Sequence, residues 1–253
     1  MKSPANGNAR ELSPLSPQPA SDSVNVLEPD SALPAAPLQP APWQLAASAY
    51  VFAVLMPDDV LMKGGFVPNH LLDKRKSRVV CAMFVDYQST NVGPYQELLL
   101  APTGFAFESG VHPSITRIYV SSYDSVVNGR NNWGIPKDRA DFVRTRDAAT
   151  STDRISVSRD AHTFAELELR AYGPALPTAT WLIPKAKRTL VQHWQGKSYR
   201  FTLSATGRAQ VARVLSWRFD AAYFPDLARG RVLAGSYLPT FNMTFPAAEI
   251  QSL

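Results

Sequence analysis

Short runs of β-branched, aromatic and aliphatic residues recur from residue 43 onward, and turn residues separate most of them. Charged and apolar residues alternate over 166–171, which is the period of a strand with one exposed face. The run 79–85 is apolar throughout and indicates a strand buried on both faces. This pattern predicts an α+β, predominantly antiparallel β domain, not a doubly wound nucleotide-binding fold. We expect strands over 50–56, 79–87, 96–100, 115–121, 154–158, 164–172, 199–204 and 213–219.

Helical signals are sparse. A short helix is expected over 122–128, where Ser121 or Ser122 could cap its start and Gly129 stands where a C-cap glycine would lie. A weaker helical pattern covers 220–227.

The first 40 residues differ in composition from the rest. Nine of the 21 prolines fall within residues 1–42, among Ser, Ala, Asn and Gln, with no apolar periodicity. We therefore expect a disordered Pro-rich tail over 1–40 and a single domain over 41–253. The tail lacks the apolar core of a secretory signal and is a poor mitochondrial presequence, so a cytoplasmic, non-membrane protein is expected.

Charge and composition narrow the function classes. The net charge is +5, but Lys and Arg are dispersed, so an ordinary basic surface is preferred over a nucleic-acid partner. Cys81 is the single cysteine, which excludes a disulfide framework and multi-Cys metal sites. The four histidines are far apart in sequence, so neither a metal nor another cofactor is expected.

The segment 128–138, with the sequence NGRNNWGIPKD, is the most unusual local sequence. Two glycines and a proline predict a rigid loop, which Trp133 and Ile135 would bury. Lys137 follows the proline and would be held in apolar surroundings. Burial would lower the pKa of its ammonium, and the neutral amine could then attack a carbonyl to form a Schiff base.

The pattern G-R-x(5)-P-K in this segment resembles the signature region of the acetoacetate decarboxylase family. Upstream, the sequence GPYQE at 93–97 resembles the family's G-x-Y-x-E segment. The resemblance covers roughly residues 43 to 250. It implies a cone-like β barrel that encloses an apolar pocket, and a homo-oligomeric assembly.

The resemblance also implies roles for particular residues. Lys137 would be the Schiff-base lysine, and Glu97 the pocket carboxylate that transfers protons or orients the substrate. Arg130 would brace the loop or face the pocket. Residues that could line the pocket, or in several cases simply fill the core, are Tyr95, Tyr119, Trp133, Asp138 and Ser48.

Several positions depart from the family pattern. Asp138 stands where the decarboxylases have a second lysine, and an anion there would raise the pKa of Lys137 unless its side chain points away. Ser48 aligns with an arginine thought to help hold the substrate carboxylate. A β-keto acid would then bring an unpaired charge into an apolar site, which is costly.

The sequence therefore predicts a lysine-dependent lyase that acts on a ketone or keto-acid substrate. Its reaction could be decarboxylation or, because the second lysine is missing, aldolase, dehydratase or cyclisation chemistry. Two alternatives stay open: a non-catalytic protein that binds an apolar metabolite on the same fold, and a basic nucleic-acid-binding protein.

Overall fold

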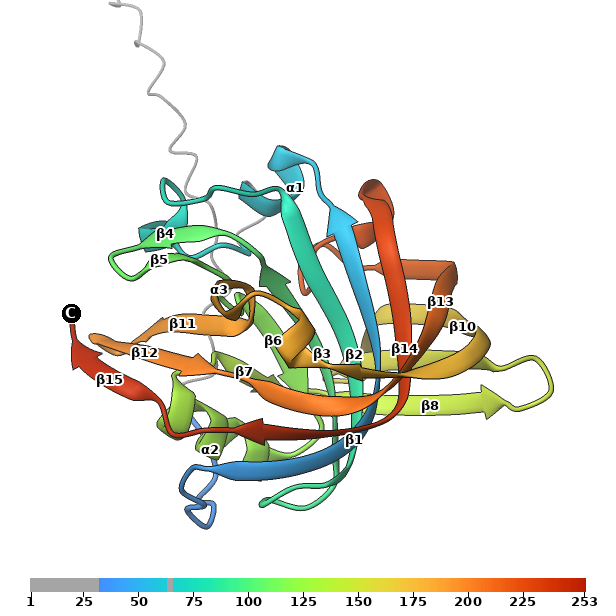
Figure 1. Cartoon of the computed structure of the whole chain (residues 1–253), viewed down its shortest axis with the longest axis horizontal. Coiled ribbons are helices and arrows are strands. Elements are labelled where there is room, and N and C mark those ends of the chain that lie inside the picture. The colour runs from blue at the N-terminus through green and yellow to red at the C-terminus, as the bar shows by residue number, and fades with distance from the viewer. Residues whose placement is uncertain (1–31, 63–65) are drawn as a thin grey trace, which may run out of the picture.

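The computed structural model describes residues 32–62 and 66–253. Within them, one large sheet has the strand order β7-β6-β3-β2-β1-β14-β13-β10-β9-β8 (Figure 1). Its neighbouring strands are antiparallel except for the parallel pair β6 and β7. The strands are β1 (Trp43–Leu55), β2 (Val79–Ser89), β3 (Tyr95–Pro102), β6 (Arg117–Val120), β7 (Lys137–Arg139), β8 (Asp141–Asp147), β9 (Thr152–Arg159), β10 (His162–Ala179), β13 (Ser204–Phe219) and β14 (Arg231–Phe245).

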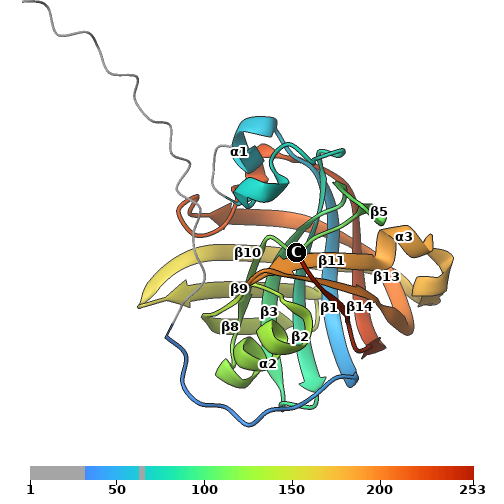
Figure 2. The ribbon, with the colours of Figure 1, turned by 90° about the vertical axis from the view of Figure 1, so that its left-hand side faces the viewer.

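Smaller elements surround this sheet. Two further sheets in the described residues are formed by β11 (Thr189–Trp194), β12 (Lys197–Thr202) and β15 (Glu249–Ser252), and by β4 (Phe105–Phe107) and β5 (Gly110–His112). The helices are α1 (Asp58–Met62), α2 (Tyr123–Trp133) and α3 (Lys185–Arg188), with 3-10 turns η1 (Asn69–Leu71), η2 (Thr180–Leu182) and η3 (Leu227–Arg229). The helices α1 and α2 lie at opposite ends of the molecule (Figure 2).

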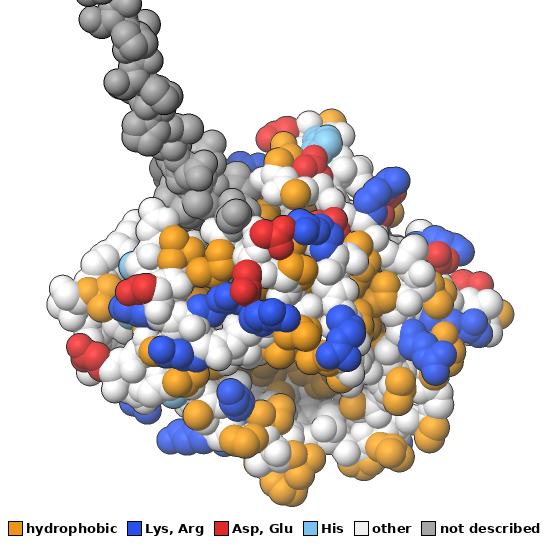
Figure 3. All heavy atoms as spheres, turned by 90° about the horizontal axis from the view of Figure 1, so that it is seen from above, with side chains coloured by type: hydrophobic (Ala, Val, Ile, Leu, Met, Phe, Trp, Pro, Cys, Tyr) orange, Lys and Arg blue, Asp and Glu red, His pale blue; other side chains and the backbone are white. Residues whose placement is uncertain are grey.

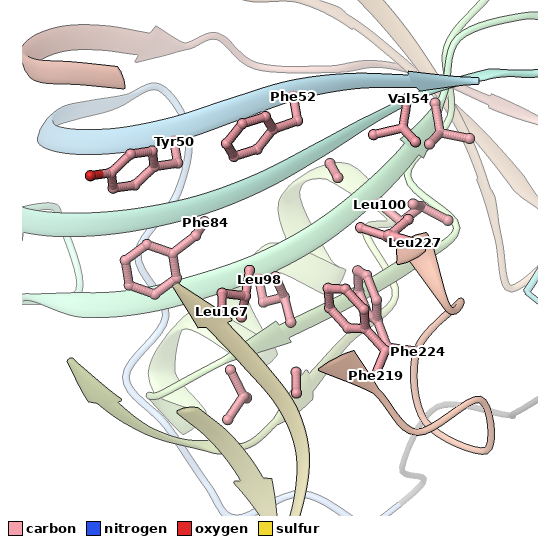
Figure 4. Close-up of a cluster of buried hydrophobic side chains, with 14 of the residues drawn as sticks. Tyr50, Phe52, Val54, Phe84, Leu98, Leu100, Leu167, Phe219, Phe224 and Leu227 are labelled. Atoms are coloured by element: carbon pink, nitrogen blue, oxygen red, sulfur yellow. The ribbon is translucent and has the colours of Figure 1, made fainter. Parts of the chain in front are cut away.

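The strands β1, β2 and β3 are buried on both faces. On one face, Tyr50, Phe84 and Leu98 point into a large hydrophobic cluster that β10 and β13 cover (Figure 4). On the other face, Leu45, Val85 and neighbouring residues belong to a second cluster. Because side chains alternate along a strand, adjacent residues of these strands enter different clusters. This confirms the expectation that the apolar run at 79–85 is buried on both faces.

The two edges of the large sheet are joined by one residue. β7 lies at one end of the strand order and β8 at the other, yet they follow each other in sequence with Ala140 between them. The Ala140 amide also donates to the Val120 carbonyl at 3.0 Å, which ties the junction to β6. The sheet therefore curls until its edges approach each other. This confirms the predicted mostly antiparallel, barrel-like fold.

The helical expectations need correction. α2 runs to Trp133, beyond the expected end at 128, and Gly134 is its C-cap at φ 62°. Gly129 lies inside the helix, so the expected rigid loop starts only at Gly134. A helix does not form over 220–227, where the described chain makes turns and enters η3.

Residues 1–31 of the expected tail lie outside the described residues. Residues 32–40 carry no helix or strand but lie against the domain. The Asn128 side chain on α2 accepts from the Gln39 amide at 2.7 Å and donates to the Pro37 carbonyl at 2.9 Å. The structure thus differs from the expectation of a free tail up to residue 40.

On the face seen in Figure 3, Lys and Arg side chains are scattered among hydrophobic and neutral ones. Among the described residues, no helix has the length and apolar character that a membrane span requires.

Candidate active site

A cavity of about 390 Å³ opens on the second hydrophobic cluster, between the large sheet and the sheet that contains β11 and β12. Its walls are mainly apolar and include Trp43, Leu99, Ile118, Trp133 and Leu190. Glu97 and Lys137 are among the ionisable side chains that line it. The cavity is therefore an apolar site that contains an amine and a carboxyl group.

Lys137 is the first residue of β7, and its side chain is buried. Its Nζ donates to Glu97 Oε2 at 3.0 Å and to Ser125 Oγ at 3.0 Å. A longer contact of 3.4 Å joins it to the Tyr95 hydroxyl. The amine is therefore held by three side chains from β3 and α2, which fixes its position in the cavity wall.

Gly129 makes room for this lysine. A Cβ at this position would lie 2.7 Å from Cδ and 2.8 Å from Cε of Lys137, closer than side-chain atoms pack. Ser125 lies one helical turn before Gly129, so both occupy the face of α2 that contacts the lysine. The glycine of the G-R pair thus serves close packing rather than helix termination.

Glu97 and its neighbours form the other half of the site. β3 places Tyr95 and Glu97 two residues apart, and both therefore face the cavity. Tyr87 on β2 donates to Glu97 Oε1 at 3.5 Å. Its ring lies 4.6 Å from that of Tyr95. The predicted contact of Glu97 and Tyr95 with the cavity agrees with the structure.

The protonation of the lysine differs from the sequence expectation. Burial lowers the pKa of Lys137, but the Glu97 carboxylate and the hydrogen bonds from Nζ outweigh it, so the pKa lies above its ordinary value. Burial raises the pKa of Tyr95 and of Tyr87. The resting site is therefore an ammonium paired with a carboxylate between two neutral phenols.

The Asp138 carboxylate points away from the amine of Lys137. Its side chain is fully buried on the opposite face of β7, where Arg130 Nη2 lies 2.8 Å from Oδ1 and Arg117 Nη1 lies 3.2 Å from Oδ2. Arg130 also donates to the Lys137 carbonyl through Nε at 2.9 Å and Nη2 at 2.7 Å. Arg130 therefore braces the backbone of the lysine, and neither it nor Asp138 lines the cavity.

Two other predicted pocket residues also lie outside the cavity. Tyr119 belongs to the first hydrophobic cluster, and its hydroxyl contacts Arg117 and donates to the Tyr223 carbonyl at 3.0 Å. Ser48 faces Arg144, whose Nη1 lies 3.4 Å from its Oγ, while its neighbour Ala49 lines the cavity. In both cases the side chain alternates to the other face of its strand. Trp133 does line the cavity.

Sequence reasoning missed Ser125, and the misplaced helix end explains why. A helix that ends at 128 would make Gly129 a C-cap, and nothing would then single out the residue one helical turn before it. The signal that could have found Ser125 is its spacing of four from Gly129 on one helix face. Cys81 also lines the cavity, and burial raises the pKa of its thiol to about 11, so it is protonated near neutral pH.

The fold is similar to those of solved enzymes. An acetoacetate decarboxylase from Legionella pneumophila subsp. pneumophila str. Philadelphia 1 aligns with a TM-score of 0.66 at 13% identity, over 95% of this chain and 98% of that one. An acetoacetate decarboxylase-like enzyme from Sphingomonas wittichii RW1 gives 0.63 at 15% identity, over 85% and 94%. The enduracididine biosynthesis enzyme MppR, complexed with the condensation product of pyruvate and imidazole 4-carboxaldehyde, gives 0.57 at 14% identity, over 85% and 91%.

Comparison with curated protein sequences gives no match. A sequence model of the acetoacetate decarboxylase family, however, matches residues 63–234, which is more than half of the chain. That span contains Glu97, Gly129 and Lys137, and the fold agrees with solved structures of this family. The chain belongs to the acetoacetate decarboxylase family.

Proposed function

We propose that this protein is a lyase that forms a Schiff base between Lys137 and a ketone or keto acid. The observation that carries the proposal is the 3.0 Å contact between Lys137 Nζ and Glu97 Oε2 in the wall of a mainly apolar cavity. A buried amine beside a buried carboxylate has both the nucleophile and the proton acceptor that imine formation needs.

The first step is a proton transfer within the pair. The ammonium of Lys137 gives a proton to Glu97, and the neutral amine attacks the carbonyl carbon to form a carbinolamine. Glu97 then returns the proton to the carbinolamine oxygen, which leaves as water, and an iminium remains. An apolar substrate favours this sequence because it removes water from the cavity, and a charged pair loses stability relative to a neutral pair there.

The iminium can then accept electrons from a bond beside it. Removal of a proton from the α carbon by the Glu97 carboxylate gives an enamine, whose carbon adds to an aldehyde in an aldol reaction. The reverse sequence cleaves a carbon–carbon bond. Decarboxylation would use the same electron acceptor, with the electrons of the bond to CO₂ in place of those of the C–H bond.

The charges around Lys137 favour the reactions without loss of CO₂. The β1 residues that line the cavity are Trp43, Leu45, Ala49 and Val51, and none is charged. A carboxylate next to the reacting carbonyl would therefore meet Glu97 without a cation from β1, at a cost in desolvation. The solved MppR complex with a condensation product of pyruvate and an aldehyde supports carbon–carbon bond formation on this fold.

The test is reductive trapping. The protein is incubated with pyruvate, acetylacetone or acetoacetate and reduced with borohydride, and the adduct is measured by intact mass and located by peptide mapping. We expect one adduct on Lys137, none on Lys137→Ala, and an unchanged adduct on Lys197→Ala, which removes an exposed lysine. Release of CO₂ from acetoacetate separates decarboxylation from aldol-type reactions. An adduct that persists in Lys137→Ala would refute the assignment.

A second candidate function is the non-catalytic binding of an apolar metabolite. The raised pKa of Lys137 favours it, because the ammonium form is not a nucleophile. This alternative predicts that no ketone is trapped at any pH, and that ligand affinity survives Lys137→Ala.

A further inference from the structure

The cavity has a second cationic region, which is formed by the last two residues of α3, Lys187 and Arg188. Lys187 and Arg188 both line the cavity, Lys187 as an exposed side chain and Arg188 as a half-buried one. Among the described residues, neither has a carboxylate within ion-pair distance, in contrast to Lys137. The cavity therefore contains cationic groups that the chain itself leaves without a counter-ion.

Arg188 also has an unused hydrogen-bond donor. Its Nη1 donates to the Leu203 carbonyl at 2.9 Å, which fixes the guanidinium. Its Nε is buried and has no hydrogen-bond partner among the described residues. A buried donor without a partner is costly, and a planar guanidinium suits the two oxygens of a carboxylate.

This region lies at the other end of the cavity from Lys137. Glu97 marks the lysine end of β3, and Thr103, just after the other end of β3, also lines the cavity. There the Ser114 amide donates to the Pro102 carbonyl at 3.3 Å. His112 Nδ1 lies 3.2 Å from the carbonyl of Ala186 on α3. At about 3.3 Å per strand residue, the six residues from Glu97 to Thr103 span about 20 Å.

The wall between the two ends is apolar. Leu99, Ala101, Ile115, Leu190 and Leu203 line it and carry no charge. The cavity thus has an amine at one end, an arginine at the other, and a hydrocarbon surface between them. A ligand that matches all three regions has a carbonyl and an anionic group separated by an aliphatic chain.

We propose that Arg188, assisted by Lys187, binds the carboxylate of a medium-chain oxo acid whose distant carbonyl reacts at Lys137. The reaction of the carbonyl at Lys137, the carbonyl half of this proposal, rests on the proposed function. The binding of the carboxylate at Arg188, the carboxylate half, does not. The substrate carboxylate is then remote from the reacting carbon. It is held by a cation instead of being placed beside Glu97.

The test of the carboxylate half uses ligands without a ketone. Octanoate and octanamide have the same chain length and differ in charge, and the cavity residues Trp43 and Trp133 provide a fluorescence signal for both. We expect the wild type to bind octanoate at least tenfold more tightly than octanamide. In Arg188→Gln this preference is lost, because octanoate weakens about tenfold and octanamide does not change.

Two further variants make the result specific. Lys185→Gln removes the same charge from an exposed α3 residue that does not line the cavity, and should keep the octanoate preference. Arg188→Lys should restore part of it, and Arg188→Met, which also removes the charge and should lose the preference, replaces Arg188→Gln if that protein does not fold. Equal affinity of the wild type for octanoate and octanamide, or an unchanged preference in Arg188→Gln, overturns the proposal.

The carbonyl half is tested by trapping 7-oxooctanoate and 2-octanone in parallel. The wild type should trap the oxo acid at concentrations about tenfold lower, and Arg188→Gln should abolish that difference. Octanoate binding should persist in Lys137→Ala. Loss of all trapping with retained octanoate preference would refute the Schiff-base function and leave the anion site standing, whereas equal trapping of the two ketones would refute the oxo-acid assignment alone.

Discussion

Lys137 and Asp138 are adjacent in sequence and serve opposite sides of β7. Lys137 points into the cavity of about 390 Å³, where it pairs with Glu97. Asp138 points into packed protein and contacts two arginines, Arg117 and Arg130. The difference teaches that neighbouring charges in a sequence can face opposite sides of a strand and pair with different partners.

The two clusters also differ in what their charges stabilise. Asp138 forms ion pairs with Arg117 and Arg130, and Arg130 also donates to the Lys137 carbonyl, so these charges stabilise the fold. The pair of Lys137 and Glu97, in contrast, lines the cavity, so Lys137 can leave its contact with Glu97 and react with a substrate. Changes in the first cluster should therefore reduce stability, and changes in the second should reduce adduct formation with little loss of stability.

Asp138→Asn should have the largest effect. It leaves two buried guanidinium groups without their carboxylate, and breaking a buried pair costs about 3–5 kcal/mol. Urea unfolding measures this loss in the free energy of unfolding. The control Asp141→Asn removes the exposed partner of Arg139 and should cost less than about 1 kcal/mol. Equal losses in the two variants would break the comparison between buried and exposed pairs.

Glu97→Gln should change adduct formation and its pH dependence together. In the wild type the carboxylate raises the pKa of Lys137, so the trapping rate should still rise with pH near the ordinary lysine pKa of about 10.4. Without the carboxylate, burial remains and lowers the pKa, so the rate should level off at a lower pH. The plateau should fall about 100-fold, because the proton acceptor is gone.

Trapping rates of pyruvate between about pH 6 and 10.5 give both quantities. Glu108→Gln, which lies outside the cavity lining, is the matched control and should follow the wild type. A wild-type pH profile in Glu97→Gln would show that the Glu97 carboxylate does not control the pKa of Lys137.

Gly129→Ala should separate stability from reactivity. Alanine is favoured over glycine within a helix by about 1 kcal/mol, but its Cβ would overlap Cδ and Cε of Lys137. The flexible lysine side chain can move away, so the free energy of unfolding should change little. The trapping rate should fall by tens of fold, since a misplacement of about 1 Å can cost about 100-fold. Asn131→Ala, on the exposed face of α2, should alter neither quantity.

Ser125→Ala should have the smallest effect. The hydroxyl accepts from Lys137 Nζ at 3.0 Å, and losing one hydrogen bond of about 1 kcal/mol corresponds to about fivefold in trapping rate. Ser122→Ala, at the start of α2, removes a hydroxyl that does not cap the helix and should leave the rate unchanged. A loss above 100-fold in Ser125→Ala would mean that the serine takes part in proton transfer.

The sequence predicted the strands better than the orientation of side chains within them. The run at 79–87 lies within β2, and 96–100 lies within β3, because β-rich composition and turns are local properties. Strand parity is not local: whether Ser48 or Ala49 faces the cavity depends on the register with β2 and β14. For the same reason Tyr119 was expected in the pocket and lies on the other face.

The motif residues came from a resemblance, and the structure adds how they are arranged. Lys137 and Glu97 meet, as the motifs imply, although they are 40 residues apart. The pKa direction could not be predicted, since the sequence gives burial but not the distance to Glu97 or the orientation of Asp138. Arg188 carries no motif and becomes notable only because folding brings α3 to the cavity.

The single residue that joins β7 to β8 has a consequence for folding. Lys137 begins β7 at one edge of the sheet, and β8, at the opposite edge, begins only two residues after β7 ends. Lys137 therefore lies where the two edges of the sheet approach each other, and these edges are at opposite ends of the strand order. Long-range contacts such as that of Lys137 with Glu97 form slowly, because residues far apart in the sequence must first be brought together. Refolding protein should regain its native strand signal before it regains the ability to trap a ketone, so reactivity would report the closure of the barrel.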